Sequence, residues 1–327
     1  MGNCLITKLK SVVSDDSILK LGEFRFSIAE YSDSDSLENF NIVPEVGVYL
    51  DIVALKGHFT NNSNNNIGTS IQVTSGGASV RATSGAVLSV PNKYLVREIK
   101  VGTSIGKPAL KFDLSALQGM VDLTVLQLPR NCEISGDLSN LSELVNLTNL
   151  NLTRQRDITG NIDGLAKMSS LERLYLDQCF KVSGDLSKLK SLPLTTLSIP
   201  YTNIESDFNY IPTTVGQLYI YNTKLKDNIA NISKLSSLSY INASATELYG
   251  SVDNITLPTT ISTFNVIDCK NITGTAEALF NKQIGVMAAG KSFTFYGKGT
   301  SVKYNGAAIT SGLKVTYTDS SYSVATV

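Results

Sequence analysis

Few side chains in this sequence of 327 residues have the types and spacing that catalysis or metal binding would require. The chain has one histidine, His58, and its four cysteines, at positions 4, 132, 179 and 269, form no C-x-x-C pair. A single histidine excludes most histidine-based zinc sites and leaves no Ser–His triad outside that one position. We therefore expect no catalytic residues, no metal site and no cofactor, and we interpret His58 as a structural or surface residue. The chemistry that remains open to the chain is binding.

The elements that would position a binding surface are repeats of the pattern Leu-x-x-Leu-x-Leu. Copies begin at Val96, Leu123, Leu147, Leu171, Leu194, Val215, Leu238 and Ile261, at spacings of 21 to 27 residues. A unit of about 20–29 residues with this pattern cannot bury its apolar face alone and must stack on its neighbours. The period therefore predicts a leucine-rich repeat solenoid of the α/β type over residues 96–280, with a parallel sheet on its concave face.

Two further positions recur in each repeat. The ninth position carries a residue suited to hydrogen bonding backbone groups where the chain leaves the strand: Asn131, Gln155, Cys179, Thr202, Thr223, Thr246 and Cys269. We call these ninth-position residues ladder residues. We therefore interpret Cys179 and Cys269 as ladder residues and not as disulfide partners or nucleophiles. After them come Ile/Val-Ser/Thr-Gly segments, whose glycines we expect to turn the backbone onto the convex side, followed by short helices or 3₁₀ turns. Pro212 and Pro258 are each followed by two threonines. We expect these segments to replace the helix in their repeats and to make the convex side irregular.

The exposed positions of the strands define a candidate binding surface on the concave face. Period-two alternation places the leucines inside and their neighbours outside. Tyrosines gather over the repeats from 171 to 238, with arginines toward the amino-terminal side. Both residue types are favoured at recognition surfaces. The predicted ligand-binding residues are Tyr175, Tyr201, Tyr219, Tyr221, Tyr240, Arg130, Arg154 and Arg173. The ligand is a protein or a glycan, since Asn, Thr and Tyr would also suit sugar hydroxyls.

The flanking segments lack the repeat. We divide the chain into an arm at 1–40, a β-rich capping and attachment domain at 41–95, the solenoid at 96–280 and a β-rich cap at 281–327. Alternating apolar residues predict strands within Val46–Leu55, Thr69–Val73 and Ala86–Val90, and again at Ser292–Tyr296 and Leu313–Tyr317. Asn305-Gly306 predicts a hairpin turn.

The composition bears on partners and location. Twenty-eight basic and 28 acidic residues give zero net charge, so no overall field attracts nucleic acid, and we expect no nucleic-acid partner. No apolar window is long enough to span a bilayer, and the amino terminus has no secretory signal pattern, so we expect no membrane insertion and no Sec-dependent export.

The Ile-Ser/Thr-Gly-Asp-Leu form of the repeats resembles bacterial leucine-rich repeats. The segments beginning at Asn3, Leu19 and Leu88 are similar to uncharacterised leucine-rich repeat proteins of gut Bacteroidales and their tailed phages. This resemblance implies a virion-associated or host-surface recognition protein without catalytic residues, and no functional residue is carried over from it.

The leading hypothesis is a non-enzymatic phage structural protein: a decoration, fibre or tail component of the virion. Residues 1–95 would attach it to other virion proteins, and the solenoid would present the binding face. The runner-up is a bacterial protein-interaction or surface-adhesion module, in the cytoplasm or at the cell surface. A third class is an effector enzyme with a catalytic domain beside the repeats. The short β-rich flanks argue against it, as does Cys4 being the sole cysteine outside the solenoid.

Overall fold

The computed structural model describes the backbone of residues 40–42, 50–54, 69–74, 77–82, 88–90, 96–101, 110–128 and 132–327, and the side chains of residues 113–128 and 134–327. The arm, His58, Arg130 and Asn131 lie outside the described residues. So do the side chains of Cys4 and Cys132.

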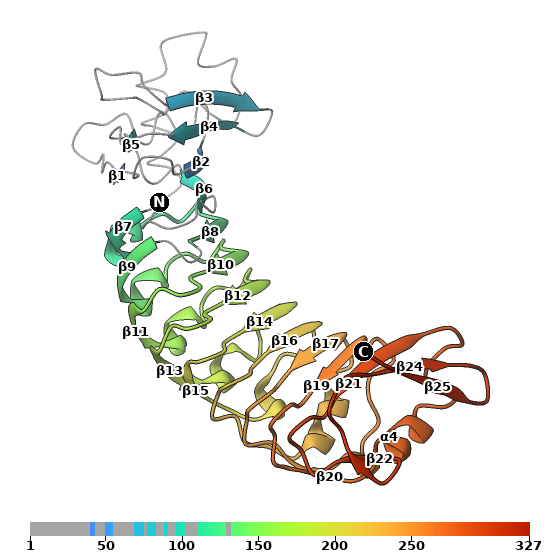
Figure 1. The fold of residues 1–327 in the computed structure, drawn as a ribbon. Coiled ribbons are helices and arrows are strands. Elements are labelled where there is room, and N and C mark those ends of the chain that lie inside the picture. The colour runs from blue at the N-terminus through green and yellow to red at the C-terminus, as the bar shows by residue number, and fades with distance from the viewer. Residues whose placement is uncertain are drawn as a thin grey trace.

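The repeats stack into a curved solenoid whose inner side is a continuous parallel sheet (Figure 1). Each strand pairs in parallel with the strand of the next repeat, and Leu150, for example, lies opposite Leu126 on one side and Leu174 on the other. In chain order these strands are β6 (Val96–Val101), β8 (Val125–Gln127), β10 (Asn149–Asn151), β12 (Arg173–Tyr175), β14 (Thr196–Ser198), β16 (Gln217–Tyr219), β17 (Tyr240–Asn242) and β19 (Thr263–Asn265). The predicted leucine-rich repeat solenoid is confirmed.

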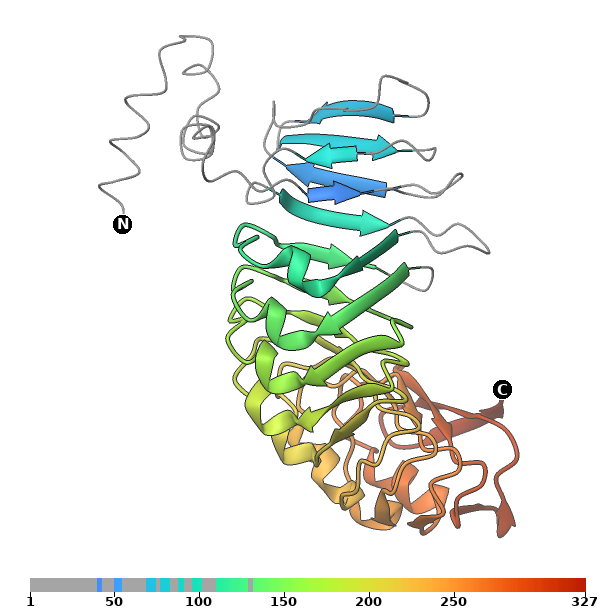
Figure 2. The same cartoon turned by 90° about the vertical axis from the view of Figure 1, so that its left-hand side faces the viewer.

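A second parallel sheet forms on the outer side of the curve, where the sequence predicted only a turn (Figures 1 and 2). Its strands are β7 (Leu110–Asp113), β9 (Cys132–Asp137), β11 (Asp157–Asn161), β13 (Lys181–Asp185) and β15 (Asn203–Glu205), and β18 (Tyr249–Ser251) pairs separately with β20 (Asn271–Thr273). Gly136, Gly160 and Gly184 lie within these strands and Gly274 directly follows β20. Each of the four has a positive φ, as at Gly160 with +104°. These glycines therefore bend a strand and do not simply reverse the chain.

In the five repeats that begin at Val96 to Leu194, and in the one at Leu238, a short 3₁₀ helix follows the outer strand, as predicted. In the repeat at Val215 such a helix forms without an outer strand. These helices are η2 (Leu114–Leu117), η3 (Leu138–Leu141), η4 (Ile162–Leu165), η5 (Leu186–Leu189), η6 (Phe208–Tyr210), η7 (Ile229–Lys234) and η8 (Val252–Asn254). The side chain of Asp137 accepts the backbone N–H of Ser139 at 2.9 Å and so caps η3. The prediction that Pro212 and Pro258 replace helix was wrong, because η6 and η8 form just upstream of each proline and are only shortened to three residues.

The core is a stack of leucine and isoleucine layers between the two sheets. Leu126, Leu150, Leu174 and Leu197 are fully buried and lie in register in adjacent strands. Burial of each such side chain contributes about 2 kcal/mol, which makes stacking of the repeats the main source of stability.

The ladder residues hydrogen bond the backbone as predicted. The hydroxyls of Thr202 and Thr223 donate to the carbonyls of Ile199 and Ile220, each at 2.7 Å. The buried thiols of Cys179 and Cys269 are free and donate to backbone carbonyls of the preceding repeats.

Antiparallel strands extend the inner sheet at both ends. On one side β6 pairs with β2 (Leu50–Ala54), followed by β4 (Gly77–Ala82) and β3 (Thr69–Thr74), while β1 (Phe40–Ile42) pairs with β5 (Leu88–Val90). The strands predicted around Leu50, Thr69 and Leu88 are confirmed; β4 was not predicted.

On the carboxy-terminal side the helix α4 (Ala276–Lys282) precedes β21 (Ser292–Tyr296), which adds one more parallel strand next to β19. The antiparallel strands β24 (Leu313–Tyr317) and β25 (Tyr322–Thr326) complete the sheet. The predicted turn at Asn305-Gly306 joins β22 (Lys303–Tyr304) to β23 (Ala307–Ala308), and both turn residues have positive φ.

Candidate functional site

The parallel register aligns the side chains that point away from the core in columns across the inner sheet. The column between the second and third leucines runs through Asn151, Tyr175, Ser198, Tyr219 and Asn242, in the register that the sequence predicted. Ser198 is short and lies between two tyrosines. A hollow therefore opens where two large rings flank a small side chain.

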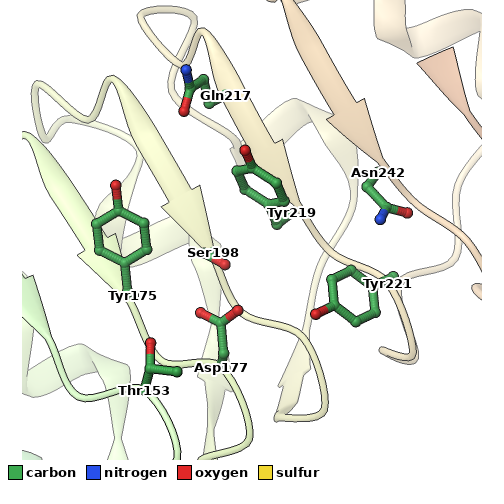
Figure 3. A pocket seen from close by; sticks show the side chains of 8 residues that line it. All are labelled: Thr153, Tyr175, Asp177, Ser198, Gln217, Tyr219, Tyr221 and Asn242. Atoms are coloured by element: carbon green, nitrogen blue, oxygen red, sulfur yellow. The ribbon is translucent and has the colours of Figure 1, made fainter. Parts of the chain in front are cut away.

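This hollow lies on the concave face and has a volume of about 390 Å³ (Figure 3). Three of the predicted tyrosines line it, and they come from strands β12 and β16 and the segment after β16. The residues that line it are Thr153, Tyr175, Asp177, Ser198, Gln217, Tyr219, Tyr221 and Asn242.

The two remaining predicted tyrosines pack against the hollow from outside. Tyr240 lies beside Tyr219 with ring centroids 4.8 Å apart, and Tyr201 meets Tyr221 edge-to-face at 5.6 Å. Phe180 extends this row, with its ring 6.4 Å from that of Tyr201, and Arg156 lies over its other side at 5.8 Å. All five predicted tyrosines thus belong to one aromatic surface, to which the structure adds Phe180.

Two predicted residues, Arg154 and Tyr201, stand at a repeated left-handed backbone position. In the six repeats whose turn is described, from the one that begins at Leu147 onward, one residue with φ between 54° and 67° stands directly before the ladder residue. The backbone N–H of Arg154 donates to the carbonyl of Asp177 at 2.7 Å, which ties this turn to the next repeat. For a tyrosine this conformation is strained by about 1–3 kcal/mol, so Tyr201 is held in place by its surroundings.

Asp177 also lines the hollow, although it is not among the ligand-binding residues predicted from the sequence. It is partly buried in the hollow, and its carboxylate points between Tyr175 and Tyr221 (Figure 3). Burial raises the pKa of this carboxyl above its usual value, although hydroxyls of Ser198 and Thr153 and the charge of Arg154 act against that shift. Asp177 is the one acidic residue in its column, which also contains Thr153, Pro200, Tyr221, Ser244 and Ile267, and that difference was a signal in the sequence.

The same surroundings raise the pKa values of two tyrosine hydroxyls in the hollow. Burial raises the pKa of Tyr219, and nearby Tyr240, Tyr175 and Asp177 raise it further. Burial is also the main cause of the raised pKa of Tyr221, followed by the charge of Asp177. Both tyrosines are thus neutral donors and acceptors at physiological pH, in a field made negative by the carboxylate.

The predicted arginines do not converge on the hollow. Arg154 lies close enough to Asp177 to act on its charge. Arg173 instead lines a separate, more polar hollow with Val125, Gln127, Thr148, Asn149 and Glu172. Arg130 lies outside the described residues, so its position stays a prediction.

Within the part of the chain whose side chains are described, no group of three or more His, Cys, Asp or Glu residues could hold a metal ion. The same part contains no helix with the length and apolar character needed to cross a membrane.

The similarity of this chain to known proteins lies among solved structures. No protein-family model matches the sequence, and no curated protein matches it. The chain is a leucine-rich repeat solenoid. Its own stacked repeats decide this.

Solved structures of similar fold include two plant receptors. The ectodomain of the Arabidopsis thaliana receptor kinase GASSHO1/SCHENGEN3 shares 18% identity over 59% of this chain, with a TM-score of 0.41. The Arabidopsis receptor kinase HAESA shares 19% identity over 58%, with a TM-score of 0.45. The chain spans only 23% and 31% of the lengths of these two proteins.

A bacterial structure is also similar, an internalin from Listeria monocytogenes. It shares 15% identity over 67% of this chain and 85% of its own length, with a TM-score of 0.25.

Proposed function

We propose that this chain is a non-catalytic recognition protein that binds a protein ligand on the concave face of its solenoid. The observation that carries the proposal is the gathering of aromatic side chains at the hollow. The row of Phe180, Tyr201 and Tyr221 borders it, and so does the pair of Tyr219 and Tyr240. Phe180 is 42% exposed and Tyr201 39%, so the surface offers large rings to a partner. Tyrosine combines contact area with a polar group at low entropic cost, which makes it a frequent anchor at interfaces.

The residue types in the column between the second and third leucines support a binding role for Tyr175 and Tyr219. Asn151, Asn242 and Asn265 each accept the backbone N–H two residues ahead, at 3.0 to 3.2 Å, and so stabilise the turn after the strand. Tyr175 and Tyr219 stand at the same position and cannot make this bond in the same way. A local stabilising interaction is replaced there by half-buried aromatic side chains, as is expected where function outweighs stability.

Site-specific photocrosslinking tests the concave face. A benzophenone amino acid is placed at Gln217, an exposed residue on the hollow, and in a separate variant at Lys188, an exposed residue of η5 on the convex side. We expect protein adducts from position 217 that are lost when Tyr175→Ala and Tyr219→Ala are combined, and none from position 188. Adducts only from position 188 would place the interface on the convex side and contradict the proposal.

For the biological setting we propose a virion, with residues 1–95 attached to other structural proteins of a tailed phage. The support is the resemblance of the leading segments and repeats to proteins of gut Bacteroidales and their phages. Mass spectrometry of purified particles, compared with the soluble lysate of the producing cells, tests this setting. Enrichment in the particles is the expected result. Presence only in the soluble lysate would favour the alternative, a bacterial interaction or adhesion module.

A further inference from the structure

Asp177 places a partly buried carboxylate in the tyrosine-lined hollow, and one of its two oxygens is unsatisfied. Its Oδ2 is out of contact with solvent and has no hydrogen-bond partner within the described side chains. A buried acceptor without a partner costs about 1–3 kcal/mol, and more when the group is charged. The folded chain alone does not recover this cost.

No basic side chain in the described part of the chain forms an ion pair with Asp177. Arg154 acts on it only through space, as the weakest of the influences on that carboxyl. Its remaining neighbours are hydroxyls and the rings of Tyr175, Tyr219 and Tyr221, whose faces are also electron-rich. The hollow therefore presents uncompensated negative potential within an aromatic wall.

We infer that the hollow receives the guanidinium of an arginine side chain of the protein ligand, with Asp177 as its acceptor and Tyr175, Tyr219 and Tyr221 around it. This inference rests on the proposed function and specifies its chemistry. A guanidinium is planar, so it can stack on a tyrosine ring while donating an N–H group to a carboxylate. It is also weakly hydrated, which lowers the cost of entering a partly buried site.

A neutral sugar satisfies the hollow less well. Sugar hydroxyls could donate to Asp177 and sugar rings could lie on the tyrosines, but the charge of the carboxylate would remain uncompensated. A cation compensates the charge and gains from the ring faces as well. The electrostatics of the hollow thus favour a basic side chain over a glycan.

The experiment uses the full chain labelled with 3-fluorotyrosine and observed by ¹⁹F NMR, with resonances assigned by single Tyr→Phe changes. The probes are the peptides Ac-Gly-Arg-Gly-NH₂ and Ac-Gly-citrulline-Gly-NH₂, which have nearly the same shape and differ by one charge. We expect the arginine peptide to shift the resonances of Tyr175, Tyr219 and Tyr221 and to saturate. Tyr210 and Tyr249, exposed residues of η6 and β18, serve as reporters outside the hollow and should not move.

The decisive comparison is between the affinities of the arginine and citrulline peptides, because it tests recognition of charge by Asp177. The citrulline peptide should bind about tenfold more weakly, the loss expected for one charge-assisted hydrogen bond. Asp177→Asn should remove this preference, and so should Asp177→Thr, which places there the residue that the preceding repeat carries at Thr153. Glu143→Gln removes an exposed acidic residue beyond η3 and should leave the preference intact.

Three results would overturn the inference. These are equal binding of the two peptides, a preference that persists in both Asp177 variants, and no response to the arginine peptide. Methyl glycosides of glucose, mannose and N-acetylglucosamine form a third set of probes, and a shift of the same resonances by these alone would favour a glycan. If crosslinking at Gln217 still depends on the tyrosines while the arginine preference is absent, only this inference fails and the proposed function stands.

Discussion

Gly160 lies against the carboxylate of Asp137, so that a Cβ on this glycine would be 2.6 Å from Oδ1 of that aspartate. Asp137 caps the 3₁₀ helix of its own repeat, and Gly160 belongs to the outer strand of the next one. The same relation recurs between Gly136 and Asp113, where the distance is 2.7 Å. The Gly-Asp pair in the repeat therefore serves two repeats at once, since the aspartate of one occupies the space left by the glycine of the next.

Gly160→Ala should lower the free energy of unfolding by about 2–3 kcal/mol. The positive φ of +104° disfavours any side chain, and the new Cβ must also displace the capping carboxylate. Gly285→Ala is the matched control, because its φ of +77° is also positive but no atom lies within 4 Å of the new Cβ. Urea unfolding should show a cost of only about 1 kcal/mol for that control. Equal costs for the two variants would show that the approach to Asp137 is unimportant.

Asp177→Asn should stabilise the protein at pH 7 by about 1 kcal/mol, because it removes a partly buried charge whose Oδ2 atom has no hydrogen-bond partner. Burial raises the folded-state pKa of this carboxyl above its value in the unfolded chain. The ionised group therefore destabilises the fold once the pH rises through the raised pKa, and this penalty is absent below the unfolded-state pKa of about 4.

The difference between variant and parent should accordingly shrink as the pH is lowered from 7 to about 4. Urea unfolding at several pH values measures it. The groups that face Asp177 are Arg154 and the tyrosines, together with the hydroxyls of Ser198 and Thr153, and the amide substitution leaves all of them in place. A variant less stable than the parent at pH 7 would mean that the carboxylate supports the fold.

Gln283→Met should raise the free energy of unfolding by about 1 kcal/mol or more. Gln283 is fully buried at the end of α4, and neither amide atom has a hydrogen-bond partner within the described residues. An unbranched apolar side chain of similar length removes the unsatisfied groups without leaving a cavity.

Gln155→Met is the opposite case and the control. Gln155 is also buried, but its amide donates to the carbonyl of Leu128 at 2.6 Å and accepts the N–H of Ile134 at 3.3 Å. Its replacement should lower stability by about 1–3 kcal/mol, because buried backbone groups lose their partners. Thermal melting of the two variants should therefore move in opposite directions, and a shift of the same sign in both would contradict this account.

Cys179 should resist alkylation until the protein unfolds. Burial raises the pKa of its thiol to about 12, so at pH 8 only about one molecule in 10,000 carries the reactive thiolate. Cys269 has a raised pKa for the same main reason. Mass spectrometry after iodoacetamide treatment should find both residues unmodified in buffer and modified in urea. Rapid modification of Cys179 in the folded state would argue against its role in the ladder.

The inner parallel sheet could be predicted from the sequence because each repeat contains the apolar pattern of one strand, and equal spacing aligns the strands of neighbouring repeats. Leu171, Leu174 and Leu176 define one inner strand, and the same spacing in the next repeat fixes the parallel register. The ladder role of Cys179 followed from the same periodicity. The outer sheet did not follow, because β11 and β13 form only when neighbouring repeats bring their backbones together.

The candidate site was predicted in part. The tyrosines could be placed on one face by alternation, and the structure brings all five together. Arg173 occupies the same face but belongs to a different hollow, since it lies two residues before Tyr175 along the strand. The alternation of side chains predicts which residues share a face, but it does not predict which of them line the same hollow.

The sequence by itself determined the solenoid, its register and the aromatic face, because these depend on a period and on the alternation of side chains along a strand. Only the tertiary structure decided that Ser198 leaves a gap between Tyr175 and Tyr219, and that Asp177 lines this hollow with its Oδ2 atom unsatisfied. These relations join residues more than 20 positions apart, and they depend on the sizes of side chains in neighbouring repeats. The physical reason is that burial and hydrogen bonding are properties of the packed assembly and not of any single repeat.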